Sequence, residues 1–262
     1  MVPLASVVIP TLERHQELES CLKSLDAQTE QRFERIILRE RGALAVLRNE
    51  GLRQARAPVV CFIDDDVVCS PTWLSSLLRV FRESPKVVGV TGPAVIPESY
   101  RTNRDIYRFR SLTWAYTTLF VLPESRPGYL TTAGTFVPTP DYSYQGSVQF
   151  LEACNMSFRT EALKAVGGFD EAYGGIGDWS EPDVCYRLRL RYGNDSLYFS
   201  PTVWLEHRPS QGGAYLFRDA DAQQRLNNYR LFSQRWVAPT VRNRLYQTFL
   251  WNYYTWKRCS AR

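Results

Sequence analysis

The sequence predicts an α/β protein in which helices flank a mixed, mainly parallel sheet and a helical extension follows at the C-terminal end. Apolar runs typical of strands, at residues 7–9, 35–38, 59–63 and 87–91, alternate with helical segments. Three consecutive aspartates follow one of these runs directly, at the kind of position where open α/β sheets bind ligands. A chain of 262 residues can also bury a large core without disulfides.

Helices are predicted where apolar residues recur at helical spacing. The first is expected over residues 15–28, with an apolar stripe made of Leu18, Cys21, Leu22 and Leu25. A later helix follows Ser70, which we expect to be its N-cap, with Pro71 at the first helical position. The aspartates therefore lie between the carboxyl end of a strand and a helix.

The middle of the chain is less regular, and order returns after it. Residues 93–146 are expected to be loops, with 129–144 the least structured part, and such long loops are usually binding loops, lids or disordered segments. The later elements are expected to be an ordered segment at 148–158, a helix at 160–166 ended by Gly167 and Gly168, a helix starting near Ser180 or Glu181, a strand near 197–205, and helices at 219–236 and 241–258.

Composition narrows the class of protein. The net charge is +5 and basic and acidic residues alternate, so we expect no nucleic-acid partner. The six cysteines form no metal-binding or disulfide spacing, which fits a reducing compartment. No signal peptide fits before the first strand, and no apolar run reaches the roughly 18 residues that span a bilayer. We therefore expect a cytoplasmic protein, with peripheral contact to the inner face of a membrane as a further possibility.

The aspartate cluster is the strongest functional signal. Because side chains alternate along a strand, Asp64 and Asp66 should point to one side and Asp65 to the other. Two carboxylates on one side suit a divalent cation beside a diphosphate. The alternative is a strand-ending turn, in which Asp is common, although three adjacent like charges repel one another.

Five motifs in order resemble those of a known family. They are Val7-Val8-Ile9-Pro10-Thr11, Arg48-Asn49-Glu50-Gly51, Asp64-Asp65-Asp66, Asn155-Met156-Ser157-Phe158-Arg159 and Gly167-Gly168-Phe169-Asp170-Glu171. Together they resemble the GT-A glycosyltransferases of family 2. The resemblance implies a Rossmann-like GT-A domain over residues 1–236, with a nucleotide-binding half at 1–92 and an acceptor-binding half at 93–236, followed by an aromatic and basic helix at 237–262.

The resemblance also implies a metal site. Asp66 would ligate a divalent cation, Mn²⁺ or Mg²⁺, Asp64 would contact the metal or the ribose, and His207 would complete the site from a later strand. Without the resemblance, His207 would be interpreted as a histidine at a strand end that is hydrogen-bonded to backbone.

Contacts to the nucleotide sugar are implied for Pro10, Thr11, Glu13, Arg39, Arg48, Asn49, Asp64 and Asp65. An alternative for Thr11 or Glu13 is to cap the following helix. The family often has an Asp that contacts the nucleotide base, whereas this chain has Arg39 and Glu40 in that region; Glu40 could replace the Asp, and Arg39 could meet phosphate. A UDP-sugar is therefore only the default donor.

An acceptor hydroxyl is a poor nucleophile at neutral pH, so direct displacement needs a carboxylate base. The candidates are Asp178, Glu181 and Asp183. In the family the base is the second acid of a Glu-Asp pair, and alignment on Asp183 places Ser180-Glu181 there, which makes Glu181 the first choice and Asp183 the second. Alternatively, these acids only complement the dipole at the start of a helix.

The chain is thus expected to be a metal-dependent hexosyltransferase that moves a sugar from a nucleotide-diphosphate sugar to the hydroxyl of a glycan, lipid-linked or small-molecule acceptor, with inversion. The alternative is a catalytically silent module that binds a nucleotide or glycan. An aspartate-nucleophile phosphatase fits less well, because its DxD follows the first strand.

The last helix carries an apolar face made of Leu245, Phe249, Tyr253 and Trp256. We expect this face to pack within the protein or against a second copy, with a membrane surface as the alternative.

Overall fold

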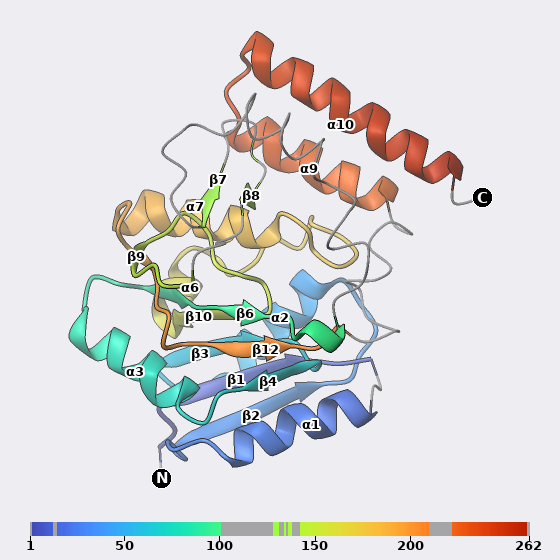
Figure 1. Cartoon of the computed structure of the whole chain (residues 1–262). Helices are drawn as coiled ribbons and strands as arrows, with labels where there is room; N and C mark the ends of the chain where they lie inside the picture. Colours follow the sequence, from blue (N-terminus) through green and yellow to red (C-terminus); the bar gives the residue numbers. More distant parts are fainter. Residues whose placement is uncertain are drawn as a thin grey trace.

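A seven-stranded sheet forms the centre of the computed structural model, with helices on both faces (Figure 1). The structure describes residues 2–12, 15–100, 128–130, 134, 136–137, 142–209 and 222–260. In spatial order the strands are β2 (Phe33–Leu38), β1 (Ala5–Pro10), β3 (Val59–Ile63), β10 (Asn155–Arg159), β5 (Gly89–Thr91), β11 (Leu197–Phe199) and β9 (Gly146–Ser147). All but β10 and β9 run in one direction, which confirms the mixed, mainly parallel sheet.

The pairing of the first strands assembles one edge of the sheet. β1 pairs in parallel with β2 and with β3, so that Val7 lies opposite Arg35 on one side and Cys61 on the other. The carboxyl ends of these strands therefore meet at the same edge. β10 comes from later in the chain and lies antiparallel between β3 and β5, so the predicted halves at 1–92 and 93–236 share a single sheet.

Helices cover the sheet and extend it at one end. In the described part they are α1 (His15–Asp26), α2 (Leu44–Gln54), α3 (Trp73–Glu83), α6 (Thr160–Ala165), α7 (Ser180–Tyr192), α9 (Ala222–Trp236) and α10 (Val241–Ser260). In Figure 1, α9 and α10 lie side by side at the end of the molecule that is farthest from α1. The helical extension that the sequence predicts is therefore present.

Alternation along β1 and β3 divides the core between the two faces of the sheet. Val7 and Ile9 are fully buried against side chains of α1 and α3. Val8 and Phe62 are buried on the opposite face, among side chains of α2 and α7. Since burying each such side chain is worth about 1.5–3 kcal/mol, the apolar strand segments account for both helical layers.

Gly51 in α2 is the point at which this helix touches the sheet. A Cβ at this position would overlap Cγ1 of Val8 and lie 2.9 Å from its Cγ2. Val8 is fully buried in a central strand and cannot move away. We expect Gly51→Ala to lower the free energy of unfolding by about 1–3 kcal/mol, measured by denaturant titration. Gly42→Ala is the control, because a Cβ there would meet only Leu47 at 3.9 Å, and equal stability of both variants would contradict the prediction.

The prediction that Ser70 caps α3 is wrong. The helix starts after Thr72, whose side chain does not cap it, and the hydroxyl of Ser70 makes no hydrogen bond among the described residues. Gln28, which follows α1, does so instead: its Oε1 accepts a hydrogen bond from the Leu74 backbone N–H at 3.0 Å, and its Nε2 donates to the Ser70 carbonyl at 2.7 Å. The side chain of Gln28 thus provides the hydrogen bond at the start of α3 that Ser70 was expected to provide.

The strand predicted near residues 197–205 is two strands in different sheets. β11 ends at Phe199, and β12 (Leu205–His207) starts after a turn in which Val203 N–H donates to the Ser200 carbonyl at 3.1 Å. β12 lies between β4 (Val67–Cys69) and β6 (Ala94–Val95) in a separate three-stranded sheet. Because of this break, the chain leaves the central sheet after β11 and reaches the aspartate cluster in β12.

Parts of the middle segment are more regular than predicted. β7 (Tyr129–Leu130) and β8 (Phe136–Val137) form an antiparallel pair inside the segment 129–144, which was expected to be the least structured part of a loop region, so these four residues are strands and not loop. A 3₁₀ turn (Glu98–Tyr100) follows β6. Residues 101–127 and most of 131–141 lie outside the described residues, as does the predicted start of a helix at 219–221.

α10 packs on its own domain, but not through the predicted face. Tyr246 and Asn243 are buried, with exposed fractions of 3% and 2%. Leu245 and Phe249 are exposed, so packing within the protein is wrong for these two residues, while packing against a second copy stays a prediction. The side chains of residues 253–260 lie outside the described residues. Among the helices in the described ranges, none is both long and apolar enough to cross a bilayer.

Candidate metal and catalytic site

Backbone pairing brings His207 to the aspartate cluster. Asp64, Asp65 and Asp66 form the turn between β3 and β4. β12 pairs antiparallel with β4, so that His207 lies opposite Val67, the residue that follows Asp66. The Arg208 N–H also donates to the carbonyl of Asp66 at 2.8 Å. The pairing of β12 with β4 thus places His207 beside the aspartate turn.

Asp64, Asp66 and His207 form a compact group of potential metal ligands. One donor atom from each lies within 4.8 Å of the other two. Nε2 of His207 is 3.4 Å from Oδ1 of Asp66, whose side chain is buried. Carboxylate oxygens and an imidazole nitrogen suit divalent cations such as Mn²⁺. The group contains the two aspartates expected on one side of the chain.

Asp65 points elsewhere and fastens the turn to β1. Its side chain is fully buried, and its Oδ2 accepts a hydrogen bond from Oγ1 of Thr11 at 2.5 Å. The Thr11 N–H in turn donates to the carbonyl of Leu38, the last residue of β2, at 2.9 Å. Thr11 and Asp65 therefore join the carboxyl ends of three strands, and the nucleotide contacts expected of them remain predictions.

Glu181 forms a buried ion pair with Arg48. Nη1 of Arg48 lies 2.5 Å from Oε1 of Glu181, and the two side chains are 2% and 9% exposed. The guanidinium also lies over the ring of Phe169, 5.4 Å from its centroid. Within the described residues no hydrogen bond occupies Oε2 of Glu181. One carboxylate oxygen is thus held in place and the other can accept a proton.

Asp183, in contrast, has both oxygens occupied. Oδ1 accepts hydrogen bonds from Tyr173 at 3.2 Å and from Nε1 of Trp236 at 2.8 Å, and lies 3.4 Å from Nη1 of Arg235. Oδ2 accepts from Nε of Arg187 at 2.8 Å. Burial raises the pKa of Tyr173 well above its ordinary value, so its hydroxyl remains a donor. Asp183 therefore joins α7 to α9 and is poorly arranged to take a proton.

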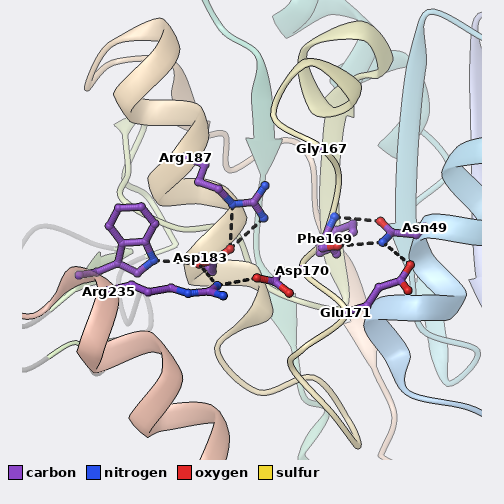
Figure 2. Close-up of a pocket in the computed structure, with 9 residues that line it drawn as sticks. Asn49, Gly167, Phe169, Asp170, Glu171, Asp183, Arg187 and Arg235 are labelled. Atoms are coloured by element: carbon purple, nitrogen blue, oxygen red, sulfur yellow. Dashed lines mark hydrogen bonds and ion pairs between the residues drawn. The ribbon is translucent and has the colours of Figure 1, made fainter.

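A cavity of about 740 Å³ lies beside Asp183 and is shown in Figure 2. Arg187 and Arg235 converge there on Asp183 from different helices (Figure 2). Asn49, on the opposite wall, binds Phe169 through both atoms of its amide, at 2.8 Å each. None of the described lining residues belongs to the Asp64–Asp66–His207 group. Asn49 thus links α2 to the Gly-Gly-Phe-Asp segment, while its predicted contact to the nucleotide sugar remains untested.

The residue before α7 has an unusual backbone conformation. Trp179 has a φ of 71°, the left-handed region, which costs a residue with a Cβ roughly 1–2 kcal/mol. Its Nε1 donates to the carbonyl of Gly134 at 2.9 Å, and its ring lies 5.2 Å from that of Tyr229. Oδ2 of Asp178, the residue before Trp179, lies 2.7 Å from Nε of Arg225. These contacts hold the sharp turn that places Glu181 in the first turn of α7.

Neither the left-handed Trp179 nor the ion pair between Arg48 and Glu181 is indicated by the sequence. No residue type signals a left-handed tryptophan, and an ion pair between residues so far apart in sequence leaves no local pattern. Arg39 and Glu40 are exposed just after β2, and Pro10 ends β1, while Glu13 lies outside the described residues.

Five of the six cysteines have described side chains, and none of these five offers a nucleophile for this site. They are free and buried: Cys21, Cys61, Cys69, Cys154 and Cys185. Burial raises the pKa of Cys61 to about 12, and that of Cys185 to about 12, which keeps these thiols protonated and inert.

Known proteins resemble this chain in sequence and in fold. The family described as glycosyl transferase family 2 matches residues 35–167, a little over half of the chain. A Haloferax volcanii protein named glucosyl-dolichyl phosphate glucuronosyltransferase is 24% identical over 225 residues, which cover 74% of this chain and 66% of that protein. The match thus spans slightly less than two thirds of the relative's length.

Two solved structures share the fold at low sequence identity. The mannosyltransferase PcManGT from Pyrobaculum calidifontis, in complex with GDP-Man and Mn²⁺, has a TM-score of 0.58 and 15% identity, over 100% of this chain and 73% of that one. GalNAc-T7 with UDP, GalNAc and Mn²⁺ has a TM-score of 0.62 and 13% identity, over 89% and 48% of the respective chains. From its matched residues and its architecture, the chain belongs to glycosyl transferase family 2 and has the GT-A fold.

Proposed function

We propose that this protein transfers a sugar from a nucleotide-diphosphate sugar to an acceptor hydroxyl with the help of a divalent cation. The observation that carries the proposal is the group of Asp64, Asp66 and His207 at the carboxyl edge of the sheet. Its donor set fits Mn²⁺ or Mg²⁺, and these three residues would hold the ion. A cation bound there supplies positive charge to the departing diphosphate.

We assign the general base to Glu181. Arg48 fixes one of its oxygens, and the other has no hydrogen bond among the described residues. In this proposal Oε2 accepts the proton of the acceptor hydroxyl while the oxygen of that hydroxyl attacks the anomeric carbon. Attack on the side away from the leaving diphosphate gives inversion. The saturated hydrogen bonding of Asp183 supports this choice over the second candidate.

The donor nucleotide would lie along the edge formed by β1, β2 and the aspartate turn. Pro10 and Thr11 end β1, and the exposed Arg39 follows β2 on the same edge. The two similar structures contain GDP-Man and UDP, so they do not favour one base. The deciding measurement is thermal stabilisation by UDP, GDP, dTDP and CDP, with and without Mn²⁺. A catalytically silent module is not favoured, because the potential metal ligands and a suitable carboxylate are both present.

We further propose a lipid-linked acceptor and peripheral membrane contact through α10. Val241, Leu245 and Phe249 are exposed at successive helical turns, with Arg242 and Arg244 beside them. Such an apolar stripe with flanking arginines suits an anionic lipid surface. The Haloferax relative, whose name contains dolichyl phosphate, lends support.

Replacing Leu245 and Phe249 together by Ser should weaken binding to anionic vesicles at least tenfold, measured by flotation, because the apolar stripe is lost. Leu190→Ser is the control, since Leu190 is 67% exposed on α7. Vesicle binding that survives the double substitution would refute membrane contact through this stripe. Loss of a dimer in the double variant, without vesicle binding by the parent, would assign the stripe to a second copy.

A further inference from the structure

A second cavity, of about 600 Å³, lies between α7, the end of α9 and the start of α10. We call it the arginine cavity, because Arg189 and Arg242 line it and no Asp or Glu is among its described lining residues. Arg189 lies eight residues after Glu181 on α7, which is about 12 Å along the helix. The cavity therefore differs from the proposed donor and metal site.

Arg189 is a partly buried cation that forms no ion pair within 4 Å among the described residues; the exposed Asp195 acts on it only through space. Its Nε is buried and makes no hydrogen bond, and its Nη2 donates only to the neutral amide of Asn194, at 2.9 Å. Burial lowers the pKa of this guanidinium from its ordinary value. Buried charges in proteins are normally paired by direct contact, and the buried Nε of Arg189 has no such contact among the described residues, so this guanidinium can still bind an anion.

Another part of the cavity wall is aromatic. Tyr186 and Trp236 have ring centroids 4.3 Å apart and an interplanar angle of 31°. Phe232 closes the cavity from the core, with 1% exposure. Flat aromatic surfaces of this kind accept the apolar face of a ring. Near the cavity, Arg242 and Arg244 of α10 are exposed and add positive charge to this surface.

We propose that the arginine cavity binds a phosphate group attached to a sugar ring. Arg189 and Arg242 contact the phosphate, since guanidinium groups match its geometry, and the Tyr186–Trp236 pair lies against the ring. The same chemistry occurs in free sugar phosphates and in lipid-linked sugar phosphates. The proposal does not depend on the function assigned to Glu181 or to the aspartate group.

Binding by the full-length protein tests the proposal, using calorimetry in the presence of EDTA so that no cation recruits phosphate to the aspartates. Glucose 6-phosphate should bind saturably, inorganic phosphate more weakly, and glucose not measurably. Arg189→Met should weaken glucose 6-phosphate at least tenfold, because charge-assisted hydrogen bonds are lost. Arg191→Met, exposed on the same helix, should stay within twofold. Equal affinity of Arg189→Met and the parent, or equal binding of glucose, would overturn the proposal.

Two further measurements separate a ligand site from a structural role. Tyr186→Leu should weaken glucose 6-phosphate severalfold and leave inorganic phosphate unchanged, because only the ring contact is lost. Arg189→Met should melt no lower than the parent without ligand, yet lose its stabilisation by glucose 6-phosphate. A lower melting temperature with unchanged probe binding would instead make Arg189 purely structural. A short-chain prenyl-phosphate glucose that binds more tightly than glucose 6-phosphate would identify a lipid-linked source, and equal affinity a free one.

Discussion

Asp66→Asn is expected to reduce sugar transfer by more than about 100-fold and to abolish the effect of Mn²⁺ on nucleotide binding. The substitution keeps the size of a buried side chain but removes the negative charge beside His207. Removing a residue that only hydrogen-bonds to a metal ligand typically lowers metal affinity or activity 10–100-fold. The loss of a direct ligand should therefore lower activity by more than that range. The measurements are the transfer rate and the UDP- or GDP-induced shift in melting temperature, each with and without Mn²⁺.

The matched control for this variant is Asp26→Asn, the same chemical change at a carboxylate that is 66% exposed and pairs with Arg35. It should leave both measurements unchanged. If Asp66→Asn transfers sugar at the parental rate, or still binds nucleotide more tightly with Mn²⁺, the aspartate group is not the metal site.

Glu181→Gln is expected to leave donor binding intact and to lower turnover by about 10²–10⁴-fold, the usual contribution of a general base. Gln retains the shape of the side chain and can still accept a hydrogen bond from Arg48, but it cannot take a proton from the acceptor. Turnover measured at saturating donor, together with stabilisation by the donor nucleotide, distinguishes lost chemistry from lost binding.

The same substitution leaves the buried Arg48 without a counter-charge, which is expected to lower the free energy of unfolding by about 3–5 kcal/mol. The double variant Arg48→Met, Glu181→Gln removes the stranded cation and should recover part of this stability without recovering turnover. Rates must therefore be compared below the melting temperature of each variant. If folded Glu181→Gln turns over at the parental rate, Glu181 is not the general base and another carboxylate has this role.

The sequence predicts the fold well where the signal is local. β3 has the predicted bounds, and α6 and α7 start where the pattern of residues indicates. Predictions failed where partners come from distant segments. Gln28 caps α3 in place of Ser70, and pairing with β4 makes a separate strand of residues 205–207.

For the candidate site, the sequence identified most of the chemical groups but not their contacts. Asp64 and Asp66 were expected on one side because strand alternation is a local property, and they lie together with His207. The sequence made Glu181 the first choice for the base and Asp183 the second. Only the packing of α2, α7 and α9 distinguishes a carboxylate with one unoccupied oxygen from one whose oxygens are both hydrogen-bonded.

The amino-acid sequence by itself determined the α/β class, the family and the aspartate cluster, because these depend on residue type and short-range spacing. Tertiary structure decided the rest: it brought His207 beside Asp66, paired Arg48 with Glu181, and buried Nε of Arg189 without a hydrogen bond among the described residues. Each of these depends on which side chains meet after the chain has folded. Burial makes these contacts energetically important, because the free-energy cost of removing a charge from water is offset only by the partners that packing brings to it.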